Sequence, residues 1–131
     1  MTDEPEPPRN KVLHIEDNPS VACAMARLLR LYGYEVVIAA TRDEAIRHVA
    51  VNGLRPDLIL TDYLLPDGIT GDNVVAEVAA LLRIKPPTIM LASVVADRDE
   101  KAKSTVDRII AKPVEIDVLL REIESLLGKG R

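Results

Sequence analysis

Five short apolar segments recur along the chain, and each is followed by a segment with helical features. The apolar segments are residues 12–15, 36–38, 58–60, 88–91 and 109–110. They are continuous apolar runs, which are typical of parallel strands buried on both faces of a sheet. Strands that alternate with helices through short connections predict an α/β fold, a doubly wound five-stranded parallel sheet with helices on both faces.

The helix boundaries carry recognisable capping residues. Asn18-Pro19-Ser20 predicts the start of a helix over 21–31, and Gly33 is a suitable residue for its end. Thr41 and Glu44 have the spacing of a capping box, which predicts a second helix that runs to about residue 51. Further helices are expected at 73–84, near 97–104, and over 116–127, where the apolar residues have a 3.6-residue period.

The length and composition favour one domain in the cytoplasm. A chain of 131 residues suits a single compact domain, which we expect over 11–128, with an acidic, proline-rich disordered tail at 1–10 and a flexible C-terminus at 129–131. The net charge of −4 and the lack of a basic block argue against nucleic-acid binding. The sequence shows no membrane-length apolar run and no secretory signal, and its single cysteine fits a reducing compartment.

Charged residues follow three of the expected strands. Glu16 and Asp17 follow the first strand, Asp62 follows the third, and Lys112 follows the fifth. In a doubly wound sheet the carboxyl ends of the strands form the functional edge, so these side chains are expected to converge there. Crowded carboxylates repel one another unless a cation neutralises them, and Mg²⁺ prefers a few carboxylate oxygens together with several waters. The alternative, scattered solvated charges at loop starts, is less favoured because all four residues stand at strand ends.

Three segments resemble the signature segments of response-regulator receiver domains: residues 11–18, 58–66 and 111–113. The resemblance extends over about residues 11–127. It implies a flavodoxin-like sheet with strand order 2-1-3-4-5, and a phosphoryl-accepting role in two-component or phosphorelay signalling rather than an enzyme activity. The implied partners are a histidine kinase or a histidine phosphotransfer protein, which donates from a phosphohistidine, and a downstream protein of unknown identity.

The resemblance also assigns roles to individual residues. Asp62 matches the phosphoacceptor, and Lys112 matches the lysine that contacts the phosphoryl group. Glu16 and Asp17 match the acidic pair that holds Mg²⁺ together with Asp62, and the backbone carbonyl of Leu64 matches a further metal ligand. The peptide bond after Lys112 is expected to be cis.

The sequence departs from the family pattern at the residues that usually report phosphorylation. Ala92 stands where the family has a hydroxyl residue at the end of the fourth strand, and Ile109 replaces an aromatic residue. Ser93, one residue later, is the expected alternative contact to the phosphoryl group. The loop 65–71 is one residue longer than the common form, and resembles receivers attached to hybrid histidine kinases.

Four other residues carry expectations about their surroundings. His14 is expected in the core rather than as a phosphorelay residue, Cys23 as a small buried residue, and Tyr63 as an exposed residue. Asp67 is expected to form a turn.

Two alternative functions remain open from the sequence. A docking module that does not switch is compatible with Ala92 and Ile109. A metal-dependent phosphatase also uses a nucleophilic aspartate at a strand end. It normally carries a second acidic residue two positions later, where this chain has Leu64.

Overall fold

The computed structural model describes residues 9–93 and 98–128. In this part of the chain, five parallel strands form one sheet in the order β2-β1-β3-β4-β5. The strands are β1 (Lys11–Ile15), β2 (Glu35–Ala39), β3 (Leu58–Asp62), β4 (Thr88–Ala92) and β5 (Arg108–Ala111). The helices are α1 (Pro19–Leu31), α2 (Arg42–Ala50), α3 (Gly71–Leu82), α4 (Glu100–Thr105) and α5 (Ile116–Leu127), with a short 3₁₀ helix η1 (Pro66–Gly68). The predicted fold and strand order are therefore confirmed.

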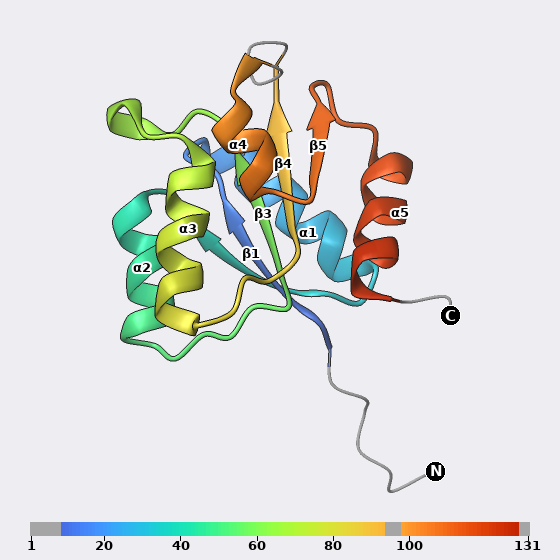
Figure 1. Ribbon diagram of the computed structural model, residues 1–131. Coiled ribbons are helices and arrows are strands. Elements are labelled where there is room, and N and C mark those ends of the chain that lie inside the picture. The colour runs from blue at the N-terminus through green and yellow to red at the C-terminus, as the bar shows by residue number, and fades with distance from the viewer. Residues whose placement is uncertain (1–8, 94–97, 129–131) are drawn as a thin grey trace, which may run out of the picture.

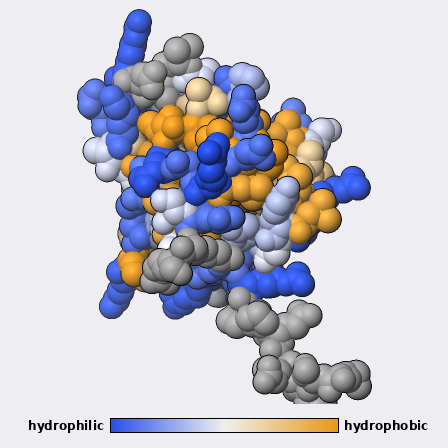
Figure 2. Space-filling model, turned by 90° about the vertical axis from the view of Figure 1, so that its right-hand side faces the viewer, coloured by the Kyte–Doolittle hydropathy of each residue, from blue (hydrophilic) through white to orange (hydrophobic). Residues whose placement is uncertain are grey.

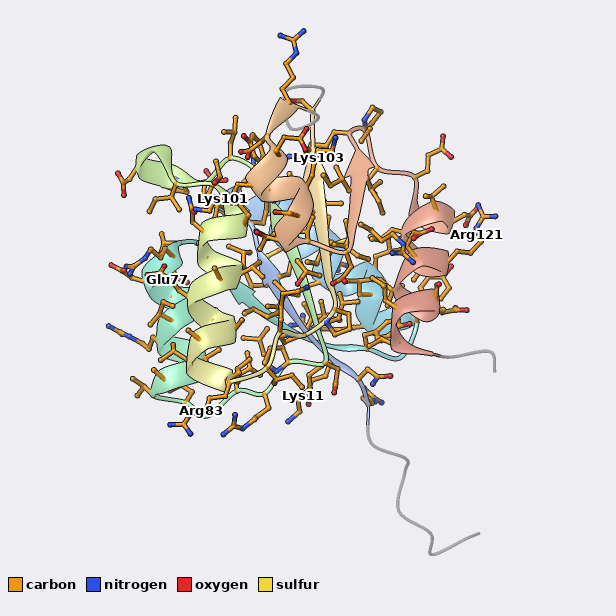
Figure 3. All side chains as sticks on the ribbon, viewed as in Figure 1. Lys11, Glu77, Arg83, Lys101, Lys103 and Arg121 are labelled. Atoms are coloured by element: carbon orange, nitrogen blue, oxygen red, sulfur yellow. The ribbon has the colours of Figure 1, made fainter. Side chains whose placement is uncertain are left out.

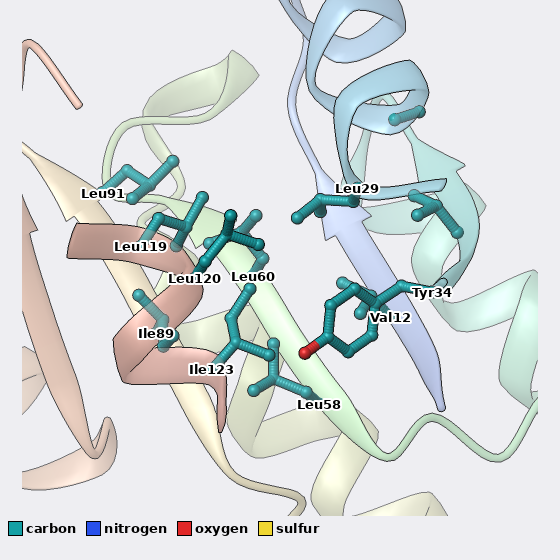
Figure 4. Close-up of a cluster of buried hydrophobic side chains, with 12 residues drawn as sticks. Val12, Leu29, Tyr34, Leu58, Leu60, Ile89, Leu91, Leu119, Leu120 and Ile123 are labelled. Carbon is teal, nitrogen blue, oxygen red and sulfur yellow. The ribbon is translucent and has the colours of Figure 1, made fainter. Parts of the chain in front are cut away.

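The helices form two layers around the sheet, with α1 and α5 on one face and α2, α3 and α4 on the other (Figure 1). Every residue of β3 and of β4 is buried, as expected of central strands covered on both faces. The core under α1 and α5 includes Leu29, Leu60 and Ile123, which lie together in Figure 4. Leu13, Ile59 and Val75 belong to the core of the opposite face.

Local capping explains where the first two helices begin. The side chain of Asn18 accepts hydrogen bonds from the backbone N–H groups of Ser20 and Val21, at 3.0 and 3.2 Å. Thr41 Oγ1 accepts one from the N–H of Glu44 at 3.2 Å. Both caps satisfy donors that have no partner inside the helix, as predicted from the sequence.

Two expected helices differ from the observed ones. The third helix begins at Gly71 and not at residue 73, and it ends before Arg83, which has a left-handed φ of 61°. The fourth begins after its cap, Asp99, whereas residues 94–97, and with them the expected start of this helix, lie outside the described residues. Residues 1–8 of the tail expected at 1–10, and the C-terminus at 129–131, also lie outside them.

The first helix corrects one expectation about packing. Cys23 is exposed, because the buried residues of α1 are Ala22, Ala26 and Leu29. These three residues are spaced four and three positions apart, so they lie on one face of the helix. Consecutive residues along a helix are rotated by about 100°, which turns Cys23 away from that face. Cys23 therefore points away from the sheet. None of the helices in the described part of the chain is long and apolar enough to cross a bilayer.

An ion pair joins the two helices that cover the second core. The guanidinium of Arg42, at the start of α2, donates to both carboxylate oxygens of Glu77 on α3, from Nε at 2.6 Å and from Nη2 at 2.5 Å. Glu77 lies on the side of α3 that faces α2 (Figure 3). The hydrogen bonds from Arg42 lower the pKa of Glu77, so this pair is fully charged at neutral pH.

At the amino-terminal edge of the sheet, Asp107 accepts hydrogen bonds from Lys85 Nζ and from the backbone N–H of Thr88, both at 2.8 Å. Partial burial raises the pKa of Asp107, but these two donors outweigh it and the pKa lies below its usual value. We expect Asp107→Ala to reduce the free energy of unfolding by about 1–2 kcal/mol at pH 7, because the N–H of Thr88 loses its acceptor.

The effect of Asp107→Ala should depend on pH. Because the folded-state pKa is lowered, the stabilisation is present above the unfolded-state pKa of about 4, and it is lost as the pH falls through the folded-state value. Urea denaturation of both proteins between pH 7 and pH 2.5 measures this. Asp107→Asn, which keeps an acceptor oxygen, should retain more stability than Asp107→Ala at pH 7. A loss that is constant with pH would contradict the assignment.

Candidate functional site

The carboxyl ends of the strands bring three acidic side chains together. Glu16 and Asp17 directly follow β1, and Asp62 is the last residue of its neighbour β3. Each of the three carboxylates has an oxygen within 4.8 Å of the others. The convergence expected from the sequence is therefore present in the fold.

Lys112 follows β5 and reaches the same place. Its Nζ forms an ion pair with Oδ1 of Asp62 at 2.6 Å, and Asp62 is only 6% exposed. Among the described residues, Asp62 Oδ1 accepts no hydrogen bond, so it keeps capacity for another partner. The peptide bond between Lys112 and Pro113 is cis, as predicted.

The two residues of the acidic pair have different surroundings. Glu16 is 4% exposed, and its Oε2 accepts a hydrogen bond from the N–H of Asn18 at 3.1 Å. Burial raises the pKa of Glu16, and the negative charge of Asp62 raises it further. The hydrogen bond from the N–H of Asn18 acts against this increase. Asp17 is exposed to solvent. A cation bound here would relieve the repulsion between Glu16 and Asp62.

The loop after Asp62 closes on itself beside the site. The N–H of Leu65 donates to the carbonyl of Ile69 at 2.9 Å, and Asp67 adopts a left-handed φ of 66°, as expected of a turn residue. Leu64 is exposed at 62% and forms an isolated antiparallel bridge with Thr70. Leu64 thus stands two residues after Asp62, in a loop with a defined shape.

Gly71 lies against the end of β3. Its N–H donates to the carbonyl of Tyr63 at 2.8 Å. A Cβ at this position would overlap the carbonyl oxygen of Asp62 and lie 2.9 Å from Cγ2 of Thr61. From the sequence, Gly71 was expected only as the last residue of a loop, whereas the structure requires glycine there because α3 starts in direct contact with the backbone of Asp62.

Ala92 and Ser93 take up different environments at the end of β4. Ala92 is buried and pairs with Ala111 of β5. Ser93 is exposed, and the residues that follow it, 94–97, lie outside the described part of the chain. The structure does not bring the Ser93 hydroxyl into contact with Asp62.

Of two residues near the site, one confirms its expectation and the other does not. His14 is fully buried, as expected, with Nδ1 3.1 Å from the carbonyl oxygen of Leu60. Burial lowers the pKa of His14, which keeps the imidazole neutral. Tyr63 was expected to be exposed, and this is wrong: it is 9% exposed, and its hydroxyl donates to Asp99 at 2.7 Å. The alternation along β3 places Tyr63 on the same face as Thr61, and α4 covers Tyr63 there.

The acidic cluster forms one end of a cleft of about 480 Å³. An apolar wall of the cleft comes from α1 and from the segment after β5: Val21, Met25, Pro113 and Val114. Figure 2 shows apolar side chains gathered in the upper half of the molecule's face on the side of α5. The site therefore combines a charged end with an apolar wall open to solvent.

Comparison with known proteins agrees with this arrangement. Residues 12–124 match the family described as "Response regulator receiver domain". The transcriptional regulatory protein PrrA of Mycobacterium tuberculosis is 32% identical over 120 residues, which are 91% of this chain and 50% of PrrA. The DNA-binding response regulator MtrA of Mycolicibacterium smegmatis is 29% identical over 124 residues, 93% of this chain and 52% of MtrA. The chain spans about half the length of these curated relatives.

Solved structures of similar shape include receiver domains of histidine kinases. One is the receiver domain of the sensor histidine kinase PA1611 from Pseudomonas aeruginosa, with a magnesium ion coordinated in its active-site cleft; it has a TM-score of 0.77 and 28% identity, over 93% of this chain and all of that one. Another is the signal receiver domain of a histidine kinase from Syntrophus aciditrophicus, with a TM-score of 0.76 and 28% identity over 91% of this chain and 90% of that one. By its sequence match and its fold, this chain belongs to the response regulator receiver domain family.

Proposed function

We propose that this receiver domain takes a phosphoryl group from a phosphohistidine onto Asp62, with Mg²⁺ held beside it. The observation that carries the proposal is the position of Asp62: it is nearly buried, paired with Lys112 Nζ at 2.6 Å, and within reach of Glu16 and Asp17. Phosphoryl transfer requires chiefly positioning and charge stabilisation of the transferred group, and these residues supply both.

In the proposed reaction, a carboxylate oxygen of Asp62 attacks the phosphorus of the donor. The new O–P bond forms as the P–N bond breaks, and the imidazole nitrogen keeps the electron pair and is protonated. Lys112 stabilises the negative charge on the phosphoryl oxygens. Later attack by water on phosphorus would release inorganic phosphate and restore the carboxylate. The domain is thus a phosphoacceptor in signalling and has no external substrate to turn over.

The acidic cluster fits Mg²⁺. Three carboxylates within 4.8 Å of one another offer hard oxygen ligands, and the exposed position of Asp17 leaves room for the waters that Mg²⁺ retains. We assign Glu16, Asp17 and Asp62 as carboxylate ligands, and the backbone carbonyl of Leu64 as a further one. The bound ion would neutralise charge on the phosphoryl oxygens. The magnesium ion named for the PA1611 receiver supports this assignment.

The proposed partners follow from the family. Relatives such as PrrA and MtrA are named as regulatory proteins, so we propose a histidine kinase or a histidine phosphotransfer protein as the donor. The apolar wall of the cleft, beside Asp62, is accessible to such a donor. The net charge of −4 supports a downstream partner that is a protein rather than a nucleic acid. We also propose a cytoplasmic location, because the single cysteine, Cys23, fits a reducing compartment.

A docking module without a switch is the second candidate. It is favoured by Ala92, which is buried and offers no hydroxyl at the end of β4, and by the aliphatic side chain of Ile109. For the phosphoacceptor function we propose Ser93 as the hydroxyl that contacts the phosphoryl group after a local shift. Ser93 is exposed, which is compatible with such a shift.

The test is labelling with acetyl phosphate, with Mg²⁺ or with a chelator. We expect one phosphoryl group per chain, seen by intact-mass spectrometry and mapped to Asp62, and only when Mg²⁺ is present. The double variant Glu16→Ala/Asp17→Ala lacks two of the three carboxylates, so a metal titration should show that it no longer binds Mg²⁺. Its labelling in the presence of Mg²⁺ should be no greater than that of the wild-type protein in the presence of chelator. Unchanged metal affinity in that variant, or equal labelling without metal, would reject the metal assignment.

A further inference from the structure

The side chain of Tyr63 connects the phosphorylation site to α4. Tyr63 follows Asp62 directly, and its N–H donates to the carbonyl of Leu91 at 3.0 Å. Its ring is buried in a further apolar cluster, between β4 and α4, which also contains Met90, Ala92, Ala102 and Val106. Because Tyr63 shares a peptide bond with Asp62, a backbone shift at the phosphorylation site moves the Tyr63 ring as well.

The hydroxyl of Tyr63 holds the first turn of α4. It donates to Oδ2 of Asp99 at 2.7 Å, while Oδ1 of the same carboxylate accepts from the N–H of Ala102 at 3.0 Å. Asp99 is thus the N-cap of α4 and is itself fixed by Tyr63. The pKa of Asp99 is lowered, first by the hydrogen bond from Tyr63 and then by that from Ala102, which agrees with a tight contact.

A second carboxylate lies close to Tyr63. Asp72 is 1% exposed, and its buried Oδ1 has no hydrogen-bond partner among the residues that the structure describes. It follows Gly71, whose N–H is bonded to the carbonyl of Tyr63 at 2.8 Å, so Asp72 stands beside Tyr63. The negative charge of Asp72 contributes to the raised pKa of Tyr63, after the larger effects of the Asp99 hydrogen bond and of desolvation. A buried carboxylate oxygen without a donor is costly, so Asp72 is an acceptor in need of one.

A separate contact keeps α4 beside α3. Lys101 of α4 donates to the side chain of Asn73 at 2.8 Å, and in Figure 3 Lys101 lies between the two helices. This contact is exposed, so it restrains α4 less than the part-buried hydrogen bond between Tyr63 and Asp99 does. The position of α4 therefore depends mainly on the packing of the Tyr63 ring and on the hydrogen bonds of its N-cap, Asp99.

We propose that Tyr63 is a two-position latch: its hydroxyl holds Asp99 and α4 when Asp62 is unphosphorylated, and transfers to Asp72 when Asp62 carries a phosphoryl group. This inference rests on the proposed function of Asp62. Transfer to Asp72 satisfies the buried oxygen, removes the anchor of the α4 cap, and loosens the first turn of that helix. Phosphorylation changes α4 because the two states differ in the acceptor of one hydroxyl. The latch needs neither a hydroxyl at position 92 nor a ring at position 109.

The experiment follows the amide of Ala102 by hydrogen exchange, with beryllium fluoride and Mg²⁺ as the phosphoryl analogue. In wild type the analogue should speed exchange at Ala102. In Tyr63→Phe, which keeps the ring and loses the hydroxyl, exchange should already be faster without analogue. The increase should be roughly tenfold, the size expected for losing a hydrogen bond to a charged acceptor, and the analogue should add little. Asp72→Asn should have the opposite effect on exchange at Ala102. A neutral amide is a weaker acceptor for the Tyr63 hydroxyl than a carboxylate, so the Ala102 amide should stay protected when the analogue binds.

Tyr32→Phe is the matched control, because Tyr32 is 57% exposed at the end of α1, and it should behave as wild type. Fluorine NMR reports separately whether the analogue binds. If the analogue does not bind wild type, the proposed function of Asp62 fails. If it binds and Ala102 in Tyr63→Phe responds as in wild type, the latch is overturned and the proposed function stands.

Discussion

Asp62→Asn is expected to abolish phosphoryl labelling completely. Asparagine has nearly the same shape but lacks the nucleophilic carboxylate oxygen, and the pair with Lys112 at 2.6 Å loses its negative partner. The fold should persist, since the Lys112 side chain is 44% exposed and can be solvated, and since one of three crowded carboxylates is removed. We therefore expect an unchanged or slightly raised melting temperature together with no mass increase from acetyl phosphate and Mg²⁺.

Asp67→Asn is the matched control for Asp62→Asn. Asp67 is exposed in the loop that follows Asp62, and asparagine tolerates its left-handed φ of 66°. This variant should label like wild type. Labelling of Asp62→Asn at the wild-type level would assign the phosphoryl group to another residue and would remove the basis of the proposed function.

Gly71→Ala is expected to cost about 3 kcal/mol or more of the free energy of unfolding, at or beyond the upper end of the usual cost of overpacking. The added Cβ would overlap the carbonyl oxygen of Asp62, which is backbone and cannot rotate away. Either α3 must move from β3 or the end of β3 must shift. Both changes displace Asp62 from Lys112, so labelling should slow along with the loss of stability. Urea denaturation and the rate of labelling by acetyl phosphate measure the two effects.

Gly53→Ala separates this overlap from backbone strain alone. Gly53 has a φ of 72° and open space where a Cβ would stand. Alanine there should cost about 1–2 kcal/mol for the left-handed conformation and should leave labelling unchanged. If Gly71→Ala were as stable as Gly53→Ala and labelled at the wild-type rate, the contact between α3 and Asp62 would not be tight.

The sequence alone determined the sheet and the charged edge. Short continuous apolar runs are typical of strands covered on both faces, and β3 and β4 are buried at every residue. Once these strands are parallel, their carboxyl ends share an edge, and residues that directly follow a strand are placed by the strand itself. This is why the meeting of Glu16, Asp62 and Lys112 could be predicted without coordinates.

Only the tertiary structure decided the surroundings of residues whose neighbours come from distant segments. Tyr63 is buried because α4 covers it, and Asp72 is buried because α3 packs against the end of β3. Gly71 appeared as a loop glycine in the sequence, but the approach of two backbones makes it necessary. Local patterns report propensity and periodicity, which depend on residues a few positions apart. Burial at the ends of elements depends instead on contacts between elements far apart in the chain, such as that between Tyr63 and Asp99, 36 positions apart.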